Sequence, residues 1–464
     1  MDERVAAAAG ATAELGEWVS RLDVADVPAA VLDRLSLVLL DVVGVTALGA
    51  GLDEQAALRA AWRPPAGPAP LIGAGRLVST DAAAWLGATA LVALELDEGN
   101  KYAKGHPAAH GFPAVLALAC ELDSTGADTA AALLAAYEVA ARFGQATAQA
   151  PGAHPHGSWG VPGAAAGCAR LLGLGAGATA AAIDTGAGLP VAGHFGSATG
   201  GNPVRDAWMG ASNLSGLVAA RMAAAGLARN TGTAALSLGT LLGRFDPAGL
   251  TAGLGERWDV TRGYFKRHAS CSFTHPAADA VLALRAELAP SRTGRIERIT
   301  VETHALGAGL AATGWDNRLS AMFSTPFVVA TALLTGEVGP ASSGAERLGD
   351  PAVRALARRV RLTAAGDLTG RLPAERAARV TVEFDDGAAP VTREVPNPVG
   401  DADHHPLDER AVVAMLKGWL PGRAGLVDRA VELSRDLPAL PHVGDPLRGL
   451  AGTGDGTEKK EEPS

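Results

Sequence analysis

The sequence predicts a mainly α protein that consists of a large all-helical domain and a smaller α+β domain. Alanine-rich segments with apolar residues at helical spacing fill the first half of the chain. Alternation of polar and apolar residues, which is typical of half-buried strands, begins only after about residue 290. Only 4% of the 464 residues are aromatic, which favours close packing of helix on helix in so large a core.

The helical domain is expected over residues 1–265. Apolar residues recur at helical spacing in three of its segments, 32–42, 115–122 and 133–140. Alanine is the strongest helix former, and glycine and proline punctuate the helical runs. Several stretches are rich in alanine and leucine, such as 35–48 and 207–228, but Asp41 interrupts the first and Arg221 the second. We therefore interpret these stretches as buried helices and not as membrane spans.

The α+β domain is expected over residues 266–400. Four short segments alternate polar and apolar residues, at 298–303, 360–363, 380–384 and 390–395. Asp385-Asp386-Gly387 is a hairpin turn signal between the last two, and a helix is expected from Pro326 to Leu334. Two further helices are expected over residues 401–450, where the chain returns to the helical domain, followed by a disordered tail over 451–464.

Charge and cysteine content narrow the classes of function. A net charge of −9 makes nucleic acid an unlikely partner. The three cysteines are too few and too scattered for a disulfide framework, which is typical of a reducing cytosol. The first residues are acidic and lack a long apolar run, so we expect no signal peptide and a cytoplasmic location.

Histidines form the most informative pattern, because six of the eleven fall in three short segments. The segments contain His106 and His110, His154 and His156, and His268 and His275. Each lies in a loop before an apolar helix, and loops on a rigid scaffold are where catalytic groups usually sit. Each histidine alone has a structural explanation as a helix cap or surface residue; three segments together weaken that explanation.

No cofactor or metal is expected. The glycine-rich residues 173–178 follow a helix-like stretch and not a strand, which argues against a dinucleotide loop. The neighbouring pairs His154/His156 and His404/His405 could each offer two zinc ligands, but a tetrahedral site needs more. An iron–sulfur cluster needs clustered thiolates, and only Cys271 lies near the histidine segments.

The order and spacing of several motifs resemble the MmgE/PrpD family, which includes 2-methylcitrate dehydratase and cis-aconitate decarboxylase. The similar segments are LDVVG at 40–44, ELDE at 95–98, HP at 106–107 with PAV at 113–115, His154 with GAAA at 163–166, KRHASCSFTH at 266–275 with ADA at 278–280, and STPF at 324–327. The resemblance covers most of the chain.

This resemblance implies a large helical domain, a smaller α+β lid, a homodimer and no cofactor. It places the active site between the two domains and implies a small di- or tricarboxylate as substrate. His106, His154 and Lys266 match family active-site residues. Glu95 or Asp97 matches an acidic position, and His275 a neighbouring histidine.

Three departures from the family pattern stand out. Arg205 replaces a family lysine and keeps its charge, although a guanidinium suits carboxylate binding better than proton transfer. Cys271 stands where the decarboxylase has a histidine, and Phe327 stands where the family has a tyrosine. His156 and the spacer at 102–105 are additional.

Dehydration of a hydroxy-polycarboxylate needs a base, an acid and cations that absorb charge on the carboxylate. We assign His106 and His154 to the acid/base pair, Lys266 and Arg205 to the carboxylates, and Asp97 to orienting or charge-stabilising a histidine. The predicted catalytic set is His106, His154, Lys266 and Asp97, and the predicted substrate-binding set is Arg205, Glu95, His156, Cys271 and His275.

The most favoured function is therefore a 2-methylcitrate dehydratase-like hydro-lyase. The same groups could support decarboxylation of a cis-aconitate-like acid or epimerisation of a dicarboxylate, because all three reactions pass through a carbanion beside a carboxylate. A non-catalytic binding scaffold is the alternative from another class.

Overall fold

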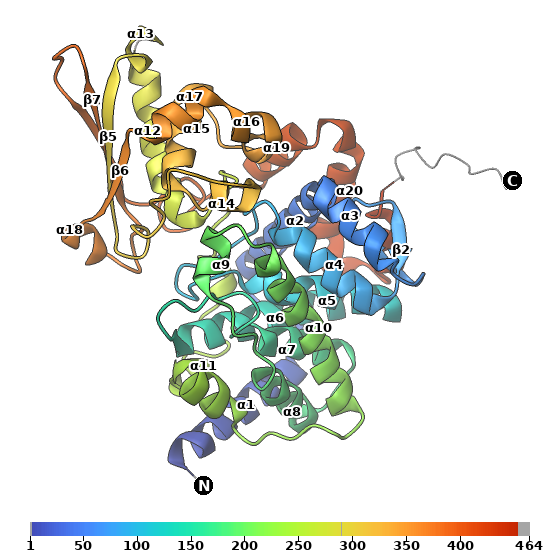
Figure 1. Cartoon of the computed structure of the whole chain (residues 1–464). Coiled ribbons are helices and arrows are strands. Elements are labelled where there is room, and N and C mark those ends of the chain that lie inside the picture. The colour runs from blue at the N-terminus through green and yellow to red at the C-terminus, as the bar shows by residue number, and fades with distance from the viewer. Residues whose placement is uncertain (1, 289, 453–464) are drawn as a thin grey trace, which may run out of the picture.

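The computed structural model describes residues 2–288 and 290–452. A large helical body contains both the N-terminal half and the last helices, and a smaller lid with a four-stranded sheet stands at one end of it (Figure 1). The predicted fold class, mainly α with a smaller α+β domain, is confirmed.

The body is built from helices whose glycine and alanine residues bring backbones close together. A Cβ atom on Gly163 would lie 2.4 Å from the carbonyl oxygen of Ala136, which only the absence of a side chain permits. The helices of the body are α1 (Glu3–Arg21), α2 (Ala29–Ala50), α3 (Asp53–Trp62), α4 (Thr80–Val92), α5 (Pro107–Leu122), α6 (Gly126–Ala146), α7 (Val161–Leu171), α8 (Ala176–Ala187), α9 (Phe195–Thr199), α10 (Val204–Ala224), α11 (Ala248–Thr251), α19 (Glu409–Trp419), α20 (Ala424–Asp436) and α21 (Gly444–Gly449).

The body also contains two short antiparallel ribbons that the sequence did not predict. β1 (Ala69–Leu71) pairs with β2 (Arg76–Val78), and β3 (Thr147–Gln149) pairs with β4 (Gly243–Phe245). Three residues are too few to display an alternating pattern, so the expectation of an all-helical domain was incomplete. The turn between β1 and β2 uses Gly73 and Gly75, both at positive φ.

The lid holds a mixed sheet with strand order β6-β5-β7-β8. Its strands are β5 (Ile296–Thr303), β6 (Val360–Ala364), β7 (Ala378–Phe384) and β8 (Val391–Val395). β6 is parallel to β5, and β7 is antiparallel to both β5 and β8. Its helices are α12 (His275–Glu287), α13 (Pro290–Thr293), α14 (Arg318–Met322), α15 (Thr325–Thr335), α16 (Ala345–Gly349), α17 (Pro351–Ala357) and α18 (Gly366–Thr369). The four predicted strands and the helix at 326–334 are confirmed.

The apolar core divides between body and lid. The body core contains buried residues between Leu15 and Ala269 and again between Val412 and Leu450. A separate lid core contains residues between Ala277 and Phe384. The expected boundaries were 265/266 and 400/401. A tail was expected over 451–464, of which residues 453–464 lie outside the described residues. Ala451 is part of the packed body: it is buried, and its carbonyl accepts a hydrogen bond from the Gly75 N–H.

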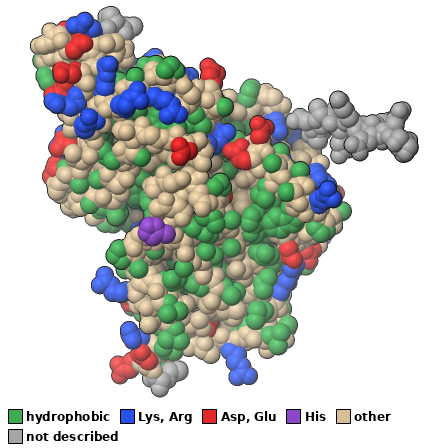
Figure 2. Space-filling model, in the orientation of Figure 1, with side chains coloured by type: hydrophobic (Ala, Val, Ile, Leu, Met, Phe, Trp, Pro, Cys, Tyr) green, Lys and Arg blue, Asp and Glu red, His purple; other side chains and the backbone are tan. Residues whose placement is uncertain are grey.

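Charge is distributed unevenly over the surface. Figure 2 shows Lys and Arg side chains gathered on the lid, whereas the visible face of the body is mainly apolar and uncharged. On the strands of the sheet, arginines form ion pairs with glutamates, such as Arg298 with Glu383 and Arg379 with Glu394. The positive charges of these strand residues are therefore largely compensated by neighbouring carboxylates.

No single helix in the described part of the chain has both the length and the apolar character needed to cross a bilayer. The consecutive helices α2 and α3 meet the length and composition criteria together, with a bend of 80° between them. Most of α2 is buried against other helices of the body.

Candidate active site

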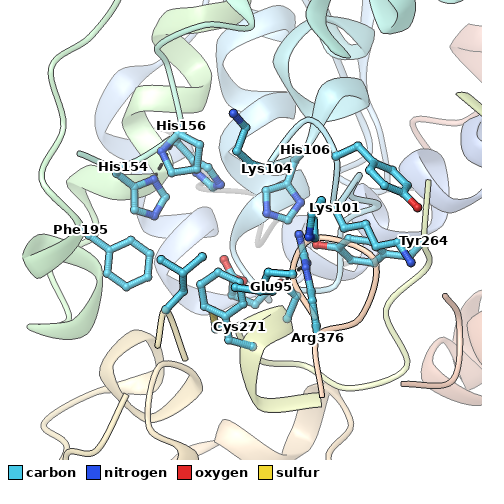
Figure 3. A pocket seen from close by; sticks show the side chains of 18 of the residues that line it. Glu95, Lys101, Lys104, His106, His154, His156, Phe195, Tyr264, Cys271 and Arg376 are labelled. Atoms are coloured by element: carbon cyan, nitrogen blue, oxygen red, sulfur yellow. Dashed lines mark hydrogen bonds between the residues drawn. The ribbon is translucent and has the colours of Figure 1, made fainter. Parts of the chain in front are cut away.

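A cavity of about 400 Å³ opens where the lid meets the body, within the range of about 300–1,000 Å³ typical of small-molecule sites. Body residues, including His106, His154 and His156, form one wall, and lid residues, including Cys271 and Arg376, form the other (Figure 3). Histidines that lie about fifty residues apart in the chain are thereby brought to one wall.

His106 enters the cavity from the N-terminus of α5. It is the N-cap residue of this helix, with Pro107 as the first helical residue, a position where proline is well tolerated. The preceding loop leaves α4 through Glu95, whose φ of 52° is uncommon for a residue with a side chain. The backbone of Asn100 pairs with that of Gly105, which closes the loop just before His106.

The hydrogen bonds of His106 determine its tautomer. Its Nδ1 lies 2.7 Å from the carbonyl oxygen of Glu98 and 3.0 Å from Oδ2 of Asp97. Because a carbonyl oxygen can only accept, Nδ1 must carry the proton. Burial lowers the pKa of His106 to about 4, although Asp97 acts in the opposite direction. In the neutral ring Nε2 is therefore an unprotonated acceptor, and no described residue is hydrogen-bonded to it.

The hydrogen bonds of His154 give the opposite tautomer. Its Nδ1 accepts a hydrogen bond from the backbone N–H of His156 at 3.1 Å, so the proton of the neutral ring lies on Nε2. Burial lowers the pKa of His154 to about 3. The ring stacks on Phe195 with centroids 5.3 Å apart and also contacts Trp208. Again no described residue is hydrogen-bonded to Nε2.

His156 lies between the other two imidazoles. Its ring meets that of His154 edge to face at 4.5 Å and that of His106 at 5.3 Å. Its pKa lies well below the usual value because the ring is buried and then because other imidazoles surround it. This ring therefore spaces His106 and His154 along the cavity wall.

Charged side chains form a continuous chain of ion pairs that includes Glu95 on the wall and continues behind it. Arg205 pairs with Glu95, whose other oxygen accepts from Lys266 Nζ at 3.1 Å. Lys266 also donates to Asp97 at 3.2 Å, and Asp97 reaches His106. Arg205 makes a further pair with Asp206 at 2.7 Å. All these side chains but that of Asp206 are almost fully buried, so each charge is stabilised mainly by its neighbours.

A second buried acidic group lies beneath the loop. Oδ2 of Asp41 accepts from the backbone N–H of Glu98, and the Tyr137 hydroxyl donates to the Glu98 carboxyl at 2.5 Å. Burial raises the pKa of Glu98 to about 8, and burial also raises that of Asp41 well above its usual value. The backbone carbonyl of Glu98 accepts the hydrogen bond from His106, whereas the Glu98 carboxyl is directed away from the cavity toward Tyr137.

Comparison with known proteins agrees with this two-domain site. Residues 13–240 match the MmgE/PrpD N-terminal domain, and residues 268–432 match the MmgE/PrpD C-terminal domain. The chain belongs to the MmgE/PrpD family. The resemblance inferred from the motifs is thereby confirmed, and the junction between the two matched domains falls at the cavity.

Two curated members of the family are similar over much of the chain. A cis-aconitate decarboxylase of Aspergillus terreus is 26% identical over 430 residues, which cover 85% of this chain and 86% of that protein. A cis-aconitate decarboxylase-like protein, oryM, of Aspergillus oryzae is 30% identical over 318 residues, or 62% of this chain and 65% of that protein. The similarity supports lyase chemistry at the level of the MmgE/PrpD family.

Not all residues predicted from the MmgE/PrpD motifs line the cavity. Glu95, His106, His154, His156 and Cys271 do so. The others of the predicted set, Asp97, Arg205, Lys266 and His275, lie behind the wall. Three of these are in the ion-pair chain, and the fourth, His275, is bonded through Nε2 to the Ser270 carbonyl at 3.0 Å. Their predicted roles stay predictions, and direct substrate contact by Arg205 or Lys266 is not favoured by this geometry.

The structure shows where two departures from the MmgE/PrpD pattern, Cys271 and Phe327, are located. Cys271 lies on the lid wall, where burial raises the pKa of its thiol, so it contributes a neutral surface. Phe327 packs in the lid core against Trp315 with centroids 4.8 Å apart. The cavity is instead lined by Phe323, so the loss of a hydroxyl at position 327 does not remove a group from it.

Sequence reasoning missed several cavity residues, and the polar ones among them are Lys101, Tyr102, Lys104, Tyr264, Ser272 and Arg376. Lys104 lies in the spacer noted as unusual, and Ser272 lies within the 266–275 motif, so both had a signal. Arg376 had none, because it stands among other lid arginines without a motif. Within the described residues no group of three or more His, Cys, Asp or Glu side chains is arranged to hold a metal ion.

Proposed function

We propose that this protein is a cofactor-independent lyase that dehydrates a small hydroxy-di- or hydroxy-tricarboxylate. One observation carries the proposal: the cavity is faced by an imidazole nitrogen that accepts a proton, on His106, and by another that donates one, on His154. Elimination of water needs one group of each kind. Two histidines with identical tautomers would not supply both at neutral pH.

In the proposed reaction, His106 Nε2 removes a proton from the carbon beside a carboxylate. The electron pair of the C–H bond moves into the carboxylate and then forms the C=C bond as the C–O bond breaks. His154 Nε2–H protonates the departing hydroxyl, so one water leaves and one alkene remains. The proton held by His106 returns to His154 through solvent, which restores both tautomers. Each acid–base group is expected to contribute about 10²- to 10⁴-fold to the rate.

Decarboxylation is the second candidate, because both curated relatives carry the name of a cis-aconitate decarboxylase or a protein like it. In that reaction a C–C bond breaks, carbon dioxide leaves, and the resulting carbanion takes a proton from His154 Nε2. No base is needed to begin it. The two candidates therefore differ in how much the rate depends on His106.

Proton NMR with the purified protein in D₂O tests the proposal. The panel contains citrate, 2-methylcitrate, malate and cis-aconitate, and the variants are His106→Gln and His154→Gln, with His442→Gln as a control. His442 is exposed and bonded to the Asp123 carbonyl, remote from the cavity. We expect alkene signals from a hydroxy acid, with both cavity variants slowed by about 10²- to 10⁴-fold and the control unchanged.

Other outcomes of the same experiment are equally informative. Loss of carbon dioxide from cis-aconitate, with His106→Gln nearly as active as the wild type, would support decarboxylation. Deuterium incorporation without net conversion would support an epimerase. Neither turnover nor exchange with any compound would contradict the lyase and favour a binding scaffold.

Homodimerisation and a cytoplasmic location also belong to this proposal, as does the absence of a nucleic-acid or membrane partner. Light scattering of the purified protein measures its oligomeric state. A mass near twice the 46.7 kDa of the chain is expected.

A further inference from the structure

A polycarboxylate substrate needs positive charge that is not already neutralised by the protein. Arg205 and Lys266 carry two positive charges, but Glu95, Asp97 and Asp206 surround them with three carboxylates. The buried charges behind the wall therefore leave no net positive charge to offer. A substrate carboxylate must find its partner elsewhere.

Three cations line the cavity within the described part of the chain: Lys104, which is exposed and donates to the Thr147 carbonyl at 2.8 Å, and the buried Lys101 and Arg376. Lys101 is engaged, because its ammonium pairs with Asp401 at 3.0 Å and with Asp403 at 2.8 Å and also donates to the Ala374 carbonyl. Arg376 has no carboxylate within ion-pair distance among the described residues. It is thus the buried cation of the cavity whose charge remains unmatched.

The guanidinium of Arg376 is held in place by groups other than carboxylates. One Nη donates to the Ser272 hydroxyl at 3.1 Å, and the planar group lies over the rings of Tyr264 and Phe273 at 5.2 and 5.5 Å. Its backbone N–H is fixed by the Asn397 side chain at 3.0 Å. Only 8% of the residue is exposed, and its side chain extends from the lid toward His106 (Figure 3).

We propose that Arg376 is the substrate-carboxylate ligand of this site, supplied by the lid across the cavity from His106. The inference rests on the carboxylate substrate class proposed above. A guanidinium presents two parallel N–H donors to a carboxylate, and its remaining donors suit this arrangement. The unmatched charge then draws a carboxylate to the lid wall, while the carbon beside another carboxylate faces the two histidines.

This placement gives the lid a role in specificity. The proton-transferring groups belong to the body, and the carboxylate ligand belongs to the lid, so the substrate must span the two. A monocarboxylate can satisfy one wall only. We therefore expect binding to require at least two carboxylates.

Isothermal titration with propane-1,2,3-tricarboxylate tests the inference without any turnover, because this acid has neither a hydroxyl to lose nor a double bond. Wild type is compared with Arg376→Gln and Arg376→Lys. Arg371→Gln is the matched control, since Arg371 lies five residues away and pairs with Glu375 and Glu394 on the lid surface. We expect Kd to rise about 10- to 100-fold for Arg376→Gln, about 3- to 10-fold for Arg376→Lys, and not at all for the control.

The outcomes separate this inference from the proposed reaction. Tight binding to the wild type without turnover of any hydroxy acid would contradict the proposed dehydration and leave the ligand assignment standing. Unchanged Kd in a folded Arg376→Gln protein, or no binding to the wild type, would overturn the assignment. Thermal unfolding reports whether each variant folds; if Arg376→Gln does not, an unchanged Kd for Arg376→Lys overturns it instead.

Discussion

Oδ2 of Asp97 lies 3.0 Å from Nδ1 of His106, on the side of the ring away from the cavity, while the Nδ1–H is bonded to the Glu98 carbonyl. The other oxygen of Asp97 accepts from Lys266. The Glu98 carbonyl fixes the nitrogen that carries the proton, and the Asp97 carboxylate places a negative charge beside the ring, which stabilises the imidazolium that forms when the ring takes up a proton. A carboxylate behind a catalytic histidine has this function in other enzymes that use imidazole as a base.

Replacement of Asp97 by Asn is expected to lower kcat by about 10²- to 10⁴-fold while the protein stays folded. Asparagine keeps the shape of the side chain but removes the negative charge that lies 3.0 Å from the ring, so the imidazolium that forms when His106 takes up a proton is less stable. Asp403→Asn, which removes an outer partner of Lys101, is the control. Steady-state rates and thermal unfolding of both variants check this; a rate for Asp97→Asn within about 3-fold of wild type would contradict a role of the Asp97 charge.

Replacement of Glu98 by Gln is expected to change the pH dependence of stability. The pKa of Glu98 is raised from 4.5 in the unfolded chain to about 8 by burial, so the folded protein holds a proton that the unfolded chain releases. The contribution of this group is fully present below pH 4.5 and is lost as the pH rises to about 8. A neutral amide has no such loss.

The measurement is the melting temperature of wild type and Glu98→Gln between pH 5 and 9. The difference between the two proteins should grow in favour of the variant as the pH rises to about 8 and then stay constant. Parallel curves over the whole range would show that Glu98 titrates normally. Glu383→Gln, at an exposed pair with Arg298 on the sheet, serves as the control.

The fold was largely predictable because its elements are long enough to show their period. β7 alternates buried and half-buried residues along its whole length, and this alternation is visible in the sequence at 380–384. The two ribbons of the body were not predictable, since each strand has three residues and its pairing depends on a distant partner. β3, for example, pairs with β4 about a hundred residues later.

The site was predictable in its residue types and only partly in its geometry. The three histidine segments and the motifs placed His106 and His154 together. Their tautomers depend on the Glu98 carbonyl and the His156 N–H, which are backbone groups that no residue pattern reveals. Arg376 is distinguished from other lid arginines by its burial on the cavity wall beside Tyr264 and Phe273, and burial is a tertiary feature.

Replacement of Lys101 by Met is expected to loosen the junction between lid and body. The ammonium joins the loop before α5 to the Ala374 carbonyl of the lid and to Asp401 and Asp403 beyond it. Removing one partner of a buried ion pair leaves a carboxylate uncompensated, at a cost of about 3–5 kcal/mol. Chemical denaturation should show this loss, and faster proteolysis between lid and body should accompany it. A variant as stable as the wild type would show that solvent replaces the ammonium without cost. Lys417→Met, at an exposed pair with Asp428, is the control.

Replacement of Gly400 by Ala is expected to damage both stability and activity, because this glycine lies against the segment that carries Lys266. Its φ is +101°, and a Cβ atom would lie 2.0 Å from the carbonyl oxygen of Phe265. The Phe265 N–H also donates to the Gly400 carbonyl at 3.1 Å, so the two backbone segments cannot separate without losing this bond.

Gly387→Ala is the matched control: Gly387 also has a positive φ, +73°, but nothing lies within 4 Å of its Cβ position. The control should lose about 1 kcal/mol from the backbone conformation alone. Gly400→Ala should lose several times more and should also lower kcat, because Phe265 moves and Lys266 with it. Equal losses of stability in the two variants, with kcat unchanged, would show that the contact at Phe265 relaxes without disturbing the ion pairs behind His106.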